Sequence, residues 1–136
     1  MRKIKFRGKQ TELGGDWIYG NLVVCKNGDC LIGRCDKYGE RCLYNEVYPN
    51  SVGQYTGMED KNGKEIYEGD ILKYEVPCET GNFIDYILVK WGKVEFSFLK
   101  KNYTNKYYRT TYQGLYKYGE IIGNIHDNPE WLGDDK

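Results

Sequence analysis

Apolar and polar residues alternate in short runs along most of this chain, and the runs end at glycine, asparagine or aspartate. This alternation predicts half-buried β-strands joined by tight turns. In the first strand, Ile4 and Phe6 should face the core while Arg7 lies on a solvated basic side. The expected strands are 1–9, 17–25, 30–35, 41–48, 71–76, 83–91, 94–99 and 120–125.

The turns are marked by residues that tolerate unusual backbone angles. Asn-Gly pairs within Lys26–Asp29 and Lys61–Lys64 predict type I′ hairpins, because both central residues of such a turn need a positive φ. A loop is expected from Pro77 to Asn82. Asn128 followed by Pro129 predicts a single helical turn near the C-terminus.

Composition supports an all-β fold. The 136 residues include 17 Gly and 14 Tyr but only 3 Pro, with a mean hydropathy of -0.75. The net charge is +0, so any attraction to nucleic acid or to an anionic membrane must be local. No apolar run approaches the roughly 18 residues of a membrane span, and no signal-peptide pattern follows the basic N-terminus. We expect a cytoplasmic protein without a membrane partner.

Three stretches resemble the YopX family of phage and prophage proteins: the signature-like run Gly53–Ile71, the opening Met1–Lys9 and the closing Ile122–Glu130. The resemblance implies a mostly β protein with a C-terminal SH3-like barrel, from a family without an agreed biochemical role. We therefore expect an N-terminal antiparallel β unit, residues 1–57, packed on an SH3-like β-barrel with a C-terminal turn, residues 58–136. The alternation pattern alone does not choose a barrel over a sandwich.

The cysteines raise the question of a metal site. Cys25, Cys30, Cys35 and Cys42 are separated by four, four and six residues, and four thiolates can enclose zinc. Structural zinc sites draw on closer pairs, however, so reduced thiols within strands are the favoured interpretation. The odd count of 5 Cys also disfavours a complete disulfide framework. We expect no metal and no cofactor.

The sequence contains no convincing group of catalytic residues. His126 is the only histidine and stands in a predicted surface turn. Glu65, Glu68 and Asp70 cluster before a strand, where the aspartate more readily accepts backbone hydrogen bonds than performs acid–base work. Asp60 opens a run that faintly resembles a calcium loop, but the glycine is misplaced. The expected class is a binding protein and not an enzyme.

Residues 96–119 have the most unusual local composition. The segment contains no Asp or Glu, whereas it holds five cations and six tyrosines. Rings stack on flat bases and Arg or Lys binds phosphate, so the pattern indicates a small anionic nucleotide as ligand. The candidate ligand-binding residues are Lys101, Tyr103, Lys106, Tyr107, Tyr108, Arg109 and Tyr112.

Several readings of this segment remain open. A plain β-hairpin or a protein interface would show the same composition, with lysines discouraging edge pairing. We expect a homo-oligomer and, inside a host cell, a counter-defence protein that sequesters a nucleotide signal. The alternatives are a nucleic-acid-binding accessory protein and an adaptor that binds a host protein. The run Val52–Ile71 is interpreted as scaffold, with Gly57, Gly63 and Gly69 needed for folding.

Overall fold

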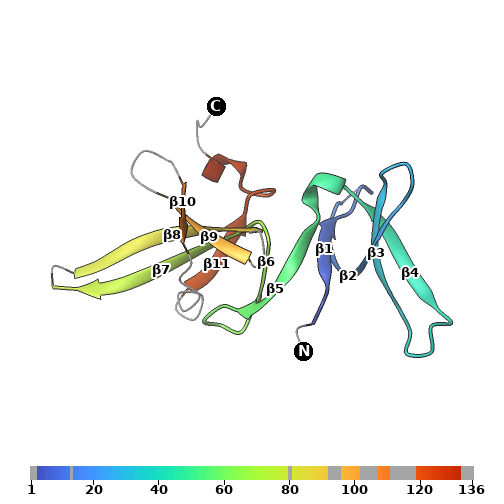
Figure 1. Cartoon of the computed structure of the whole chain (residues 1–136), viewed down its shortest axis with the longest axis horizontal. Coiled ribbons are helices and arrows are strands. Elements are labelled where there is room, and N and C mark those ends of the chain that lie inside the picture. The colour runs from blue at the N-terminus through green and yellow to red at the C-terminus, as the bar shows by residue number, and fades with distance from the viewer. Residues whose placement is uncertain are drawn as a thin grey trace. The chain divides into compact units, whose positions relative to one another are not determined.

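The computed structural model of the chain describes residues 3–12, 14–79, 81–91, 96–101, 107–110 and 119–132 (Figure 1). It divides the chain into two compact units, Met1–Tyr55 and Thr56–Lys136. Among the described residues, antiparallel strands make up nearly all of the regular structure, and the short helices η1 (Pro49–Ser51) and η3 (Pro129–Leu132) are single 3-10 turns. The expectation of an all-β fold is confirmed. In the described ranges no helix is long and apolar enough to cross a membrane.

The described strands are β1 (Phe6–Lys9), β2 (Trp17–Val24), β3 (Cys30–Cys35), β4 (Cys42–Val47), β5 (Gly53–Glu59), β6 (Glu65–Tyr67), β7 (Asp70–Cys78), β8 (Gly81–Trp91), β9 (Phe96–Lys101), β10 (Tyr107–Thr110) and β11 (Gly119–Asn124). Eight of the described strands overlap the expected runs, whereas β5, β6 and β10 have no counterpart among them.

The N-terminal unit is a curved antiparallel sheet that nearly closes on itself. Its strands lie in the order β4-β3-β2-β1-β5, with β5 continuing to β6 in the second unit. At the end of β1 the chain meets β4 again, through a bridge between Gln10 and Val47. The Tyr48 N–H donates to the Lys9 carbonyl at 2.9 Å beside that bridge. Because β4 would otherwise end the sheet, this contact covers part of its exposed edge.

The core of this unit forms where closure brings β1, β3 and β4 together. Ile32 and Val47 are fully buried beside Cys30, with partly buried apolar side chains from β1 and β2 packed against them. Gly8 is buried at the same place, and a Cβ there would lie 2.8 Å from Val47 Cγ2. The missing side chain therefore lets β1 approach the core closely.

Arg7 corrects the expected outer face of the first strand. The side chain is only 5% exposed, and its guanidinium carbon lies 4.7 Å from the centre of the Trp17 ring. Ile4, which alternation placed in the core, is 68% exposed. Backbone pairing of this stretch reaches back to Lys5, whose carbonyl accepts the Tyr55 N–H at 2.8 Å, so Ile4 lies beyond the sheet that would orient it.

The Asn-Gly hairpins occur where predicted, but their turn type differs. Gly63 N–H donates to the Asp60 carbonyl, and Asp60 N–H donates to the Lys64 carbonyl. The loop is thus a turn that ends in a left-handed glycine, with φ of 81° at Gly63, in place of the two-residue type I′ loop. The Asp60 side chain favours this form because it binds the N–H groups inside the loop.

The C-terminal unit contains a five-stranded antiparallel sheet in the order β10-β9-β8-β7-β11. Its described core consists of Ile66, Leu72, Ile87 and Val89, with Met58 and Ile121 packed against them. The SH3-like barrel expected for this unit stays a prediction.

The expected loop at Pro77–Asn82 is instead the end of a long hairpin. Pro77 pairs with Asn82 and Cys78 with Gly81, so β7 and β8 continue to within two residues of each other. β11 pairs with β7 only from Asp70 to Tyr74, so Pro77 lies beyond the part of β7 that has a described neighbour on both sides. A proline is tolerated there because no ladder hydrogen bond needs its missing N–H.

Gly33 provides a test of the N-terminal unit. Replacing Gly33 with Ala places a Cβ against the Leu43 carbonyl, and a backbone group cannot rotate away. We expect Gly33→Ala to lower the free energy of unfolding by roughly 3 kcal/mol, measured by urea denaturation.

The matched control is Gly28→Ala. Gly28 has a φ of 97° but nothing within 4 Å of an added Cβ, so only backbone strain of about 1 kcal/mol applies. Equal losses for the two variants would contradict the close approach of β3 and β4 at Gly33.

Candidate functional site

Asp60 is the structural centre of the signature-like run. The side chain is 6% exposed, and its Oδ1 accepts the N–H groups of Asn62 and Lys64 at 2.9 Å each. Its Oδ2 accepts the Ile121 N–H at 3.0 Å, which joins the hairpin loop to β11. Both carboxylate oxygens are thus engaged by backbone donors, which explains the residue as a structural tie and not as a calcium ligand.

Gly69 and Asp70 form a second tie in the same run. The buried Asp70 carboxylate accepts the Tyr67 N–H at 2.8 Å, so the aspartate closes the turn that precedes β7. Gly69, with φ of 94°, donates its N–H to the Val89 carbonyl and accepts the N–H of Ile125. These contacts support the interpretation of the run as scaffold, and they explain Asp70 without acid–base chemistry.

The environment of Asp60 shifts its acidity. Burial alone would raise the pKa of this carboxyl group, but hydrogen bonds from the N–H groups of Ile121, Lys64 and Asn62, with the nearby Lys64 charge, outweigh it. The net result is a pKa below the ordinary value of 3.8. The carboxylate form is therefore the one that stabilises the folded chain.

The cationic and aromatic segment is described only in part. Tyr103, Lys106 and Tyr112 lie outside the described residues, and for the remaining candidates the backbone alone is described. The backbone register places Tyr107 opposite Lys101, Tyr108 opposite Lys100 and Arg109 opposite Leu99. The sequence prediction of a ligand site here stays a prediction, now with its backbone partners known.

The cysteines differ from expectation. Cys35 and Cys42 form a disulfide, so the prediction that all thiols are reduced is wrong for this pair. The physical reason is their register, because they are directly opposed at the ends of β3 and β4. Cys25 and Cys30 are free thiols. With two of the four sulfurs bonded to each other, the four-thiolate zinc arrangement is not formed.

His126 lies in a turn built by Asn124. The Asn124 Oδ1 accepts the N–H groups of His126 and Asp127, both at 2.9 Å, and its Nδ2 donates to the Asp127 carboxylate. Asn124 is itself 9% exposed. This network accounts for the closing stretch of the family resemblance as a turn held by side chains.

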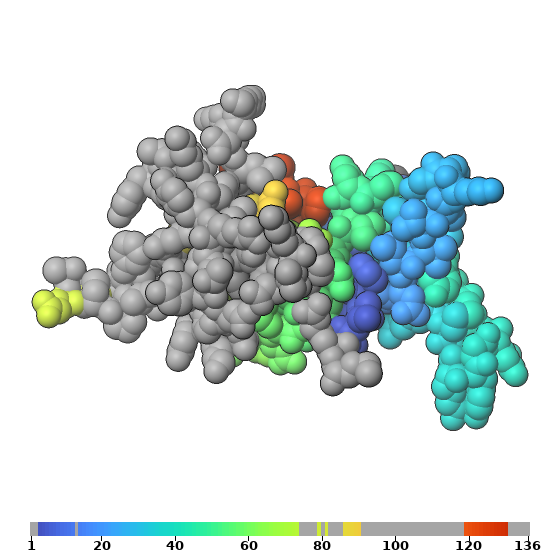
Figure 2. Space-filling view, viewed as in Figure 1, coloured from blue at the N-terminus to red at the C-terminus, as the bar shows by residue number. Residues whose placement is uncertain are grey.

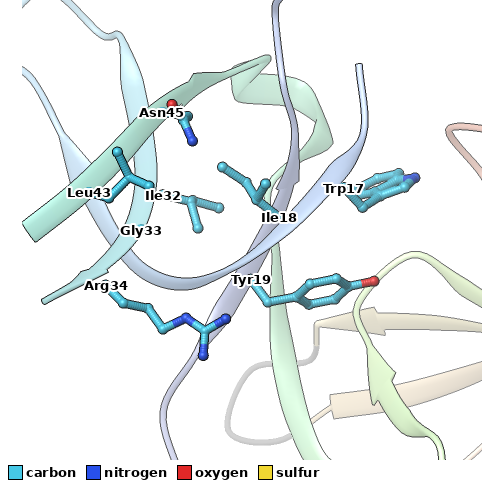
Figure 3. Close-up of a pocket in the computed structure, with 8 residues that line it drawn as sticks. All are labelled: Trp17, Ile18, Tyr19, Ile32, Gly33, Arg34, Leu43 and Asn45. Atoms are coloured by element: carbon cyan, nitrogen blue, oxygen red, sulfur yellow. The ribbon is translucent and has the colours of Figure 1, made fainter. Parts of the chain in front are cut away.

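Sequence reasoning missed a groove in the N-terminal unit. The groove has a volume of about 290 Å³, and its lining residues are Trp17, Ile18, Tyr19, Ile32, Gly33, Arg34, Leu43 and Asn45. Figure 3 shows Ile18 and Ile32 in the middle, with Asn45 on one side and Arg34 on the other. The residues come from β2, β3 and β4, so only the curvature and pairing of these strands assemble the groove. No local motif in the sequence marks it.

Asp60 gives a pH-dependent prediction. In Asp60→Asn the amide oxygen can still accept from the loop, but its NH₂ group then faces the Ile121 N–H. We expect a loss of about 2 kcal/mol in the free energy of unfolding at pH 7. Because the folded pKa is lowered, the advantage of the native chain is full above pH 3.8 and shrinks as the pH falls below that value.

Urea denaturation of both proteins between pH 7 and pH 2.5 measures this difference. Asp29→Asn is the control, since Asp29 is an exposed aspartate beside the other Asn-Gly turn. An advantage of the native chain over Asp60→Asn that does not change with pH would contradict the role of the ionised carboxylate.

Comparisons with known proteins agree with this architecture. Among solved structures, the chain is similar to the crystal structure of protein EF1440 from Enterococcus faecalis, with 23% identity and a TM-score of 0.57 over 97% of this chain and 99% of that chain. At this identity the likeness concerns the fold. The comparison with curated proteins gives no match. The family described as YopX protein matches residues 5–133. The chain therefore belongs to the YopX protein family.

Proposed function

We propose that this YopX-family chain is a non-enzymatic protein that binds a small anionic nucleotide through its β9–β10 hairpin. The observation that carries the proposal is the register of these strands. It places Lys101 opposite Tyr107 and Lys100 opposite Tyr108, so residues six and eight positions apart in the chain become neighbours. The register thereby pairs cations with aromatic residues along the two strands, which supports a binding role for the segment.

The position of the hairpin within its sheet also supports binding. In the described part of the C-terminal unit, β10 is the outermost strand, next to β9. A strand in that position leaves one line of backbone N–H and C=O groups available for a ligand or partner. Arg109 lies on this strand, opposite Leu99.

Charge points to an anionic ligand. Residues 96–119 contain five cations and no acid, in a chain whose total charge is +0. Phosphate groups pair with Arg and Lys, whereas tyrosine rings stack on a nucleobase. In the phage or prophage setting that the family resemblance implies, sequestering a nucleotide would deprive a host defence system of its signal. The protein would act by stoichiometric binding, assembled as a homo-oligomer.

Thermal unfolding in the presence of cyclic dinucleotides and linear mono- and dinucleotides tests the proposal. A ligand at 100 times its Kd adds about 2.7 kcal/mol to the free energy of unfolding, and for a chain of this size that raises the Tm on the order of 10 °C. We expect at least one nucleotide to produce such a rise in the native chain and Arg109→Gln to reduce it strongly.

Lys90→Gln is the matched control, because Lys90 is an exposed cation on β8 outside the hairpin. No rise in Tm with any nucleotide would overturn the proposal. Tight, strongly salt-dependent binding of single-stranded DNA or RNA, with no response to small nucleotides, would replace it with the nucleic-acid alternative.

A further inference from the structure

The groove in the N-terminal unit contains polar groups that the fold does not use. The Arg34 guanidinium is solvent-exposed, and within the described part of the chain it forms no ion pair, hydrogen bond or ring contact. The same holds for the half-buried side-chain amide of Asn45. A guanidinium offers five N–H donors and an amide offers both donors and an acceptor. Both are free to bind a molecule in the groove.

The middle of the groove is apolar. Ile32 is fully buried and Ile18 half-buried, and Leu43 remains 72% exposed at the edge of the sheet. Trp17 and Tyr19, which flank Ile18 on β2, are also lining residues, with Tyr19 43% exposed. Figure 3 shows the rings of Trp17 and Tyr19 extending away from Ile32, Leu43 and Asn45. The accessible apolar surface therefore belongs to Ile18 and Leu43, which suits a ligand with a small apolar group.

Charge and size narrow the ligand further. Arg34 is the only charged residue among the eight that line the groove, so the site carries a single positive charge. The volume of about 290 Å³ lies at the lower end of the roughly 300–1,000 Å³ that small-molecule sites occupy. A mononucleotide or a compound of similar size matches this volume better than a dinucleotide.

The backbone of β3 helps to open the site. A Cβ on Gly33 would collide with the Leu43 carbonyl, so this position of the lining cannot carry a side chain. The neighbouring strand has a second glycine, Gly20, whose Cβ would meet the Gly33 carbonyl and lie 3.2 Å from Arg34 Cγ. The two glycines thus allow the strands to curve tightly beside Arg34.

We propose that this groove is a binding site for a small molecule that combines an apolar group with one oxyanion, either phosphate or carboxylate. The apolar group lies on Ile18 and Leu43, Arg34 binds the oxyanion and Asn45 hydrogen-bonds to a polar group of the ligand. The site belongs to the N-terminal unit, whereas the β9–β10 hairpin belongs to the C-terminal unit, so each can be tested by its own variants.

Titration of the ¹⁵N-labelled full-length chain with adenosine 5′-monophosphate and, separately, with indole-3-acetate tests the proposal. These probes share a ring and an oxyanion but distinguish a nucleotide source from an aromatic carboxylate. The Trp17 indole N–H and the Asn45 side-chain amide act as built-in reporters by NMR. We expect saturable shifts confined to the groove for at least one probe.

Arg34→Gln should weaken that binding about tenfold or more, because the charge-assisted hydrogen bonds to the oxyanion are lost. Arg41→Gln is the matched control, since Arg41 is an exposed arginine next to the same hairpin but outside the groove lining. It should change the Kd less than twofold. Asn45→Ala gives a second variant that keeps the charge and should weaken binding to a smaller extent.

Two results would overturn the proposal: no saturable shift with either probe up to 10 mM, or equal affinity in the native chain and Arg34→Gln. Arg109→Gln separates this site from the proposed nucleotide surface. Groove binding that persists unchanged in Arg109→Gln supports the separate site, even if the β9–β10 proposal fails. Loss of the groove shifts in Arg109→Gln would instead assign the binding to the C-terminal unit.

Discussion

The fold of the C-terminal unit depends on one buried carboxylate. Asp60 accepts three backbone N–H groups, two within its own hairpin loop and one from β11, which is 61 residues further along the chain. A hydrogen bond between a charged acceptor and a backbone donor is stronger than a neutral pair, and burial leaves few competing waters. Local turn geometry and a long-range strand position are therefore fixed by the same side chain.

The signature-like run is better understood as an organiser than as a site. Like Asp60, Gly69 joins distant parts of the chain. Its N–H donates to the Val89 carbonyl on β8, and its carbonyl accepts the N–H of Ile125, which follows β11. At its other end the run pairs with β1, where Gln54 lies opposite Phe6. All three stretches that carry the family resemblance are thus connected through main-chain hydrogen bonds. Residues that make such contacts are constrained by folding.

The sequence predicted the β-strands better than it predicted the buried side chains, the disulfide or the groove. Alternation located most strands of both units, though not β5, β6 or β10, because period-two patterns reflect local burial. It failed for Arg7, whose burial against Trp17 depends on the neighbouring strand and not on its own. It also failed for Cys35 and Cys42, which are opposed only because the hairpin register brings them together. The groove around Arg34 required three strands to curve together, so no single segment could reveal it.

The disulfide has a consequence for the most prominent hairpin of the N-terminal unit. Figure 2 shows this hairpin projecting from the unit, and its loop carries Tyr38 at 73% exposure. Such a loop is where proteases cut first. Lys37 and Arg41 lie between Cys35 and Cys42, so a trypsin-like cut after either residue leaves both fragments covalently joined. A single cut in this loop therefore leaves the chain in one covalently joined piece. The exposed tip of the hairpin is also the kind of site where insertions are tolerated.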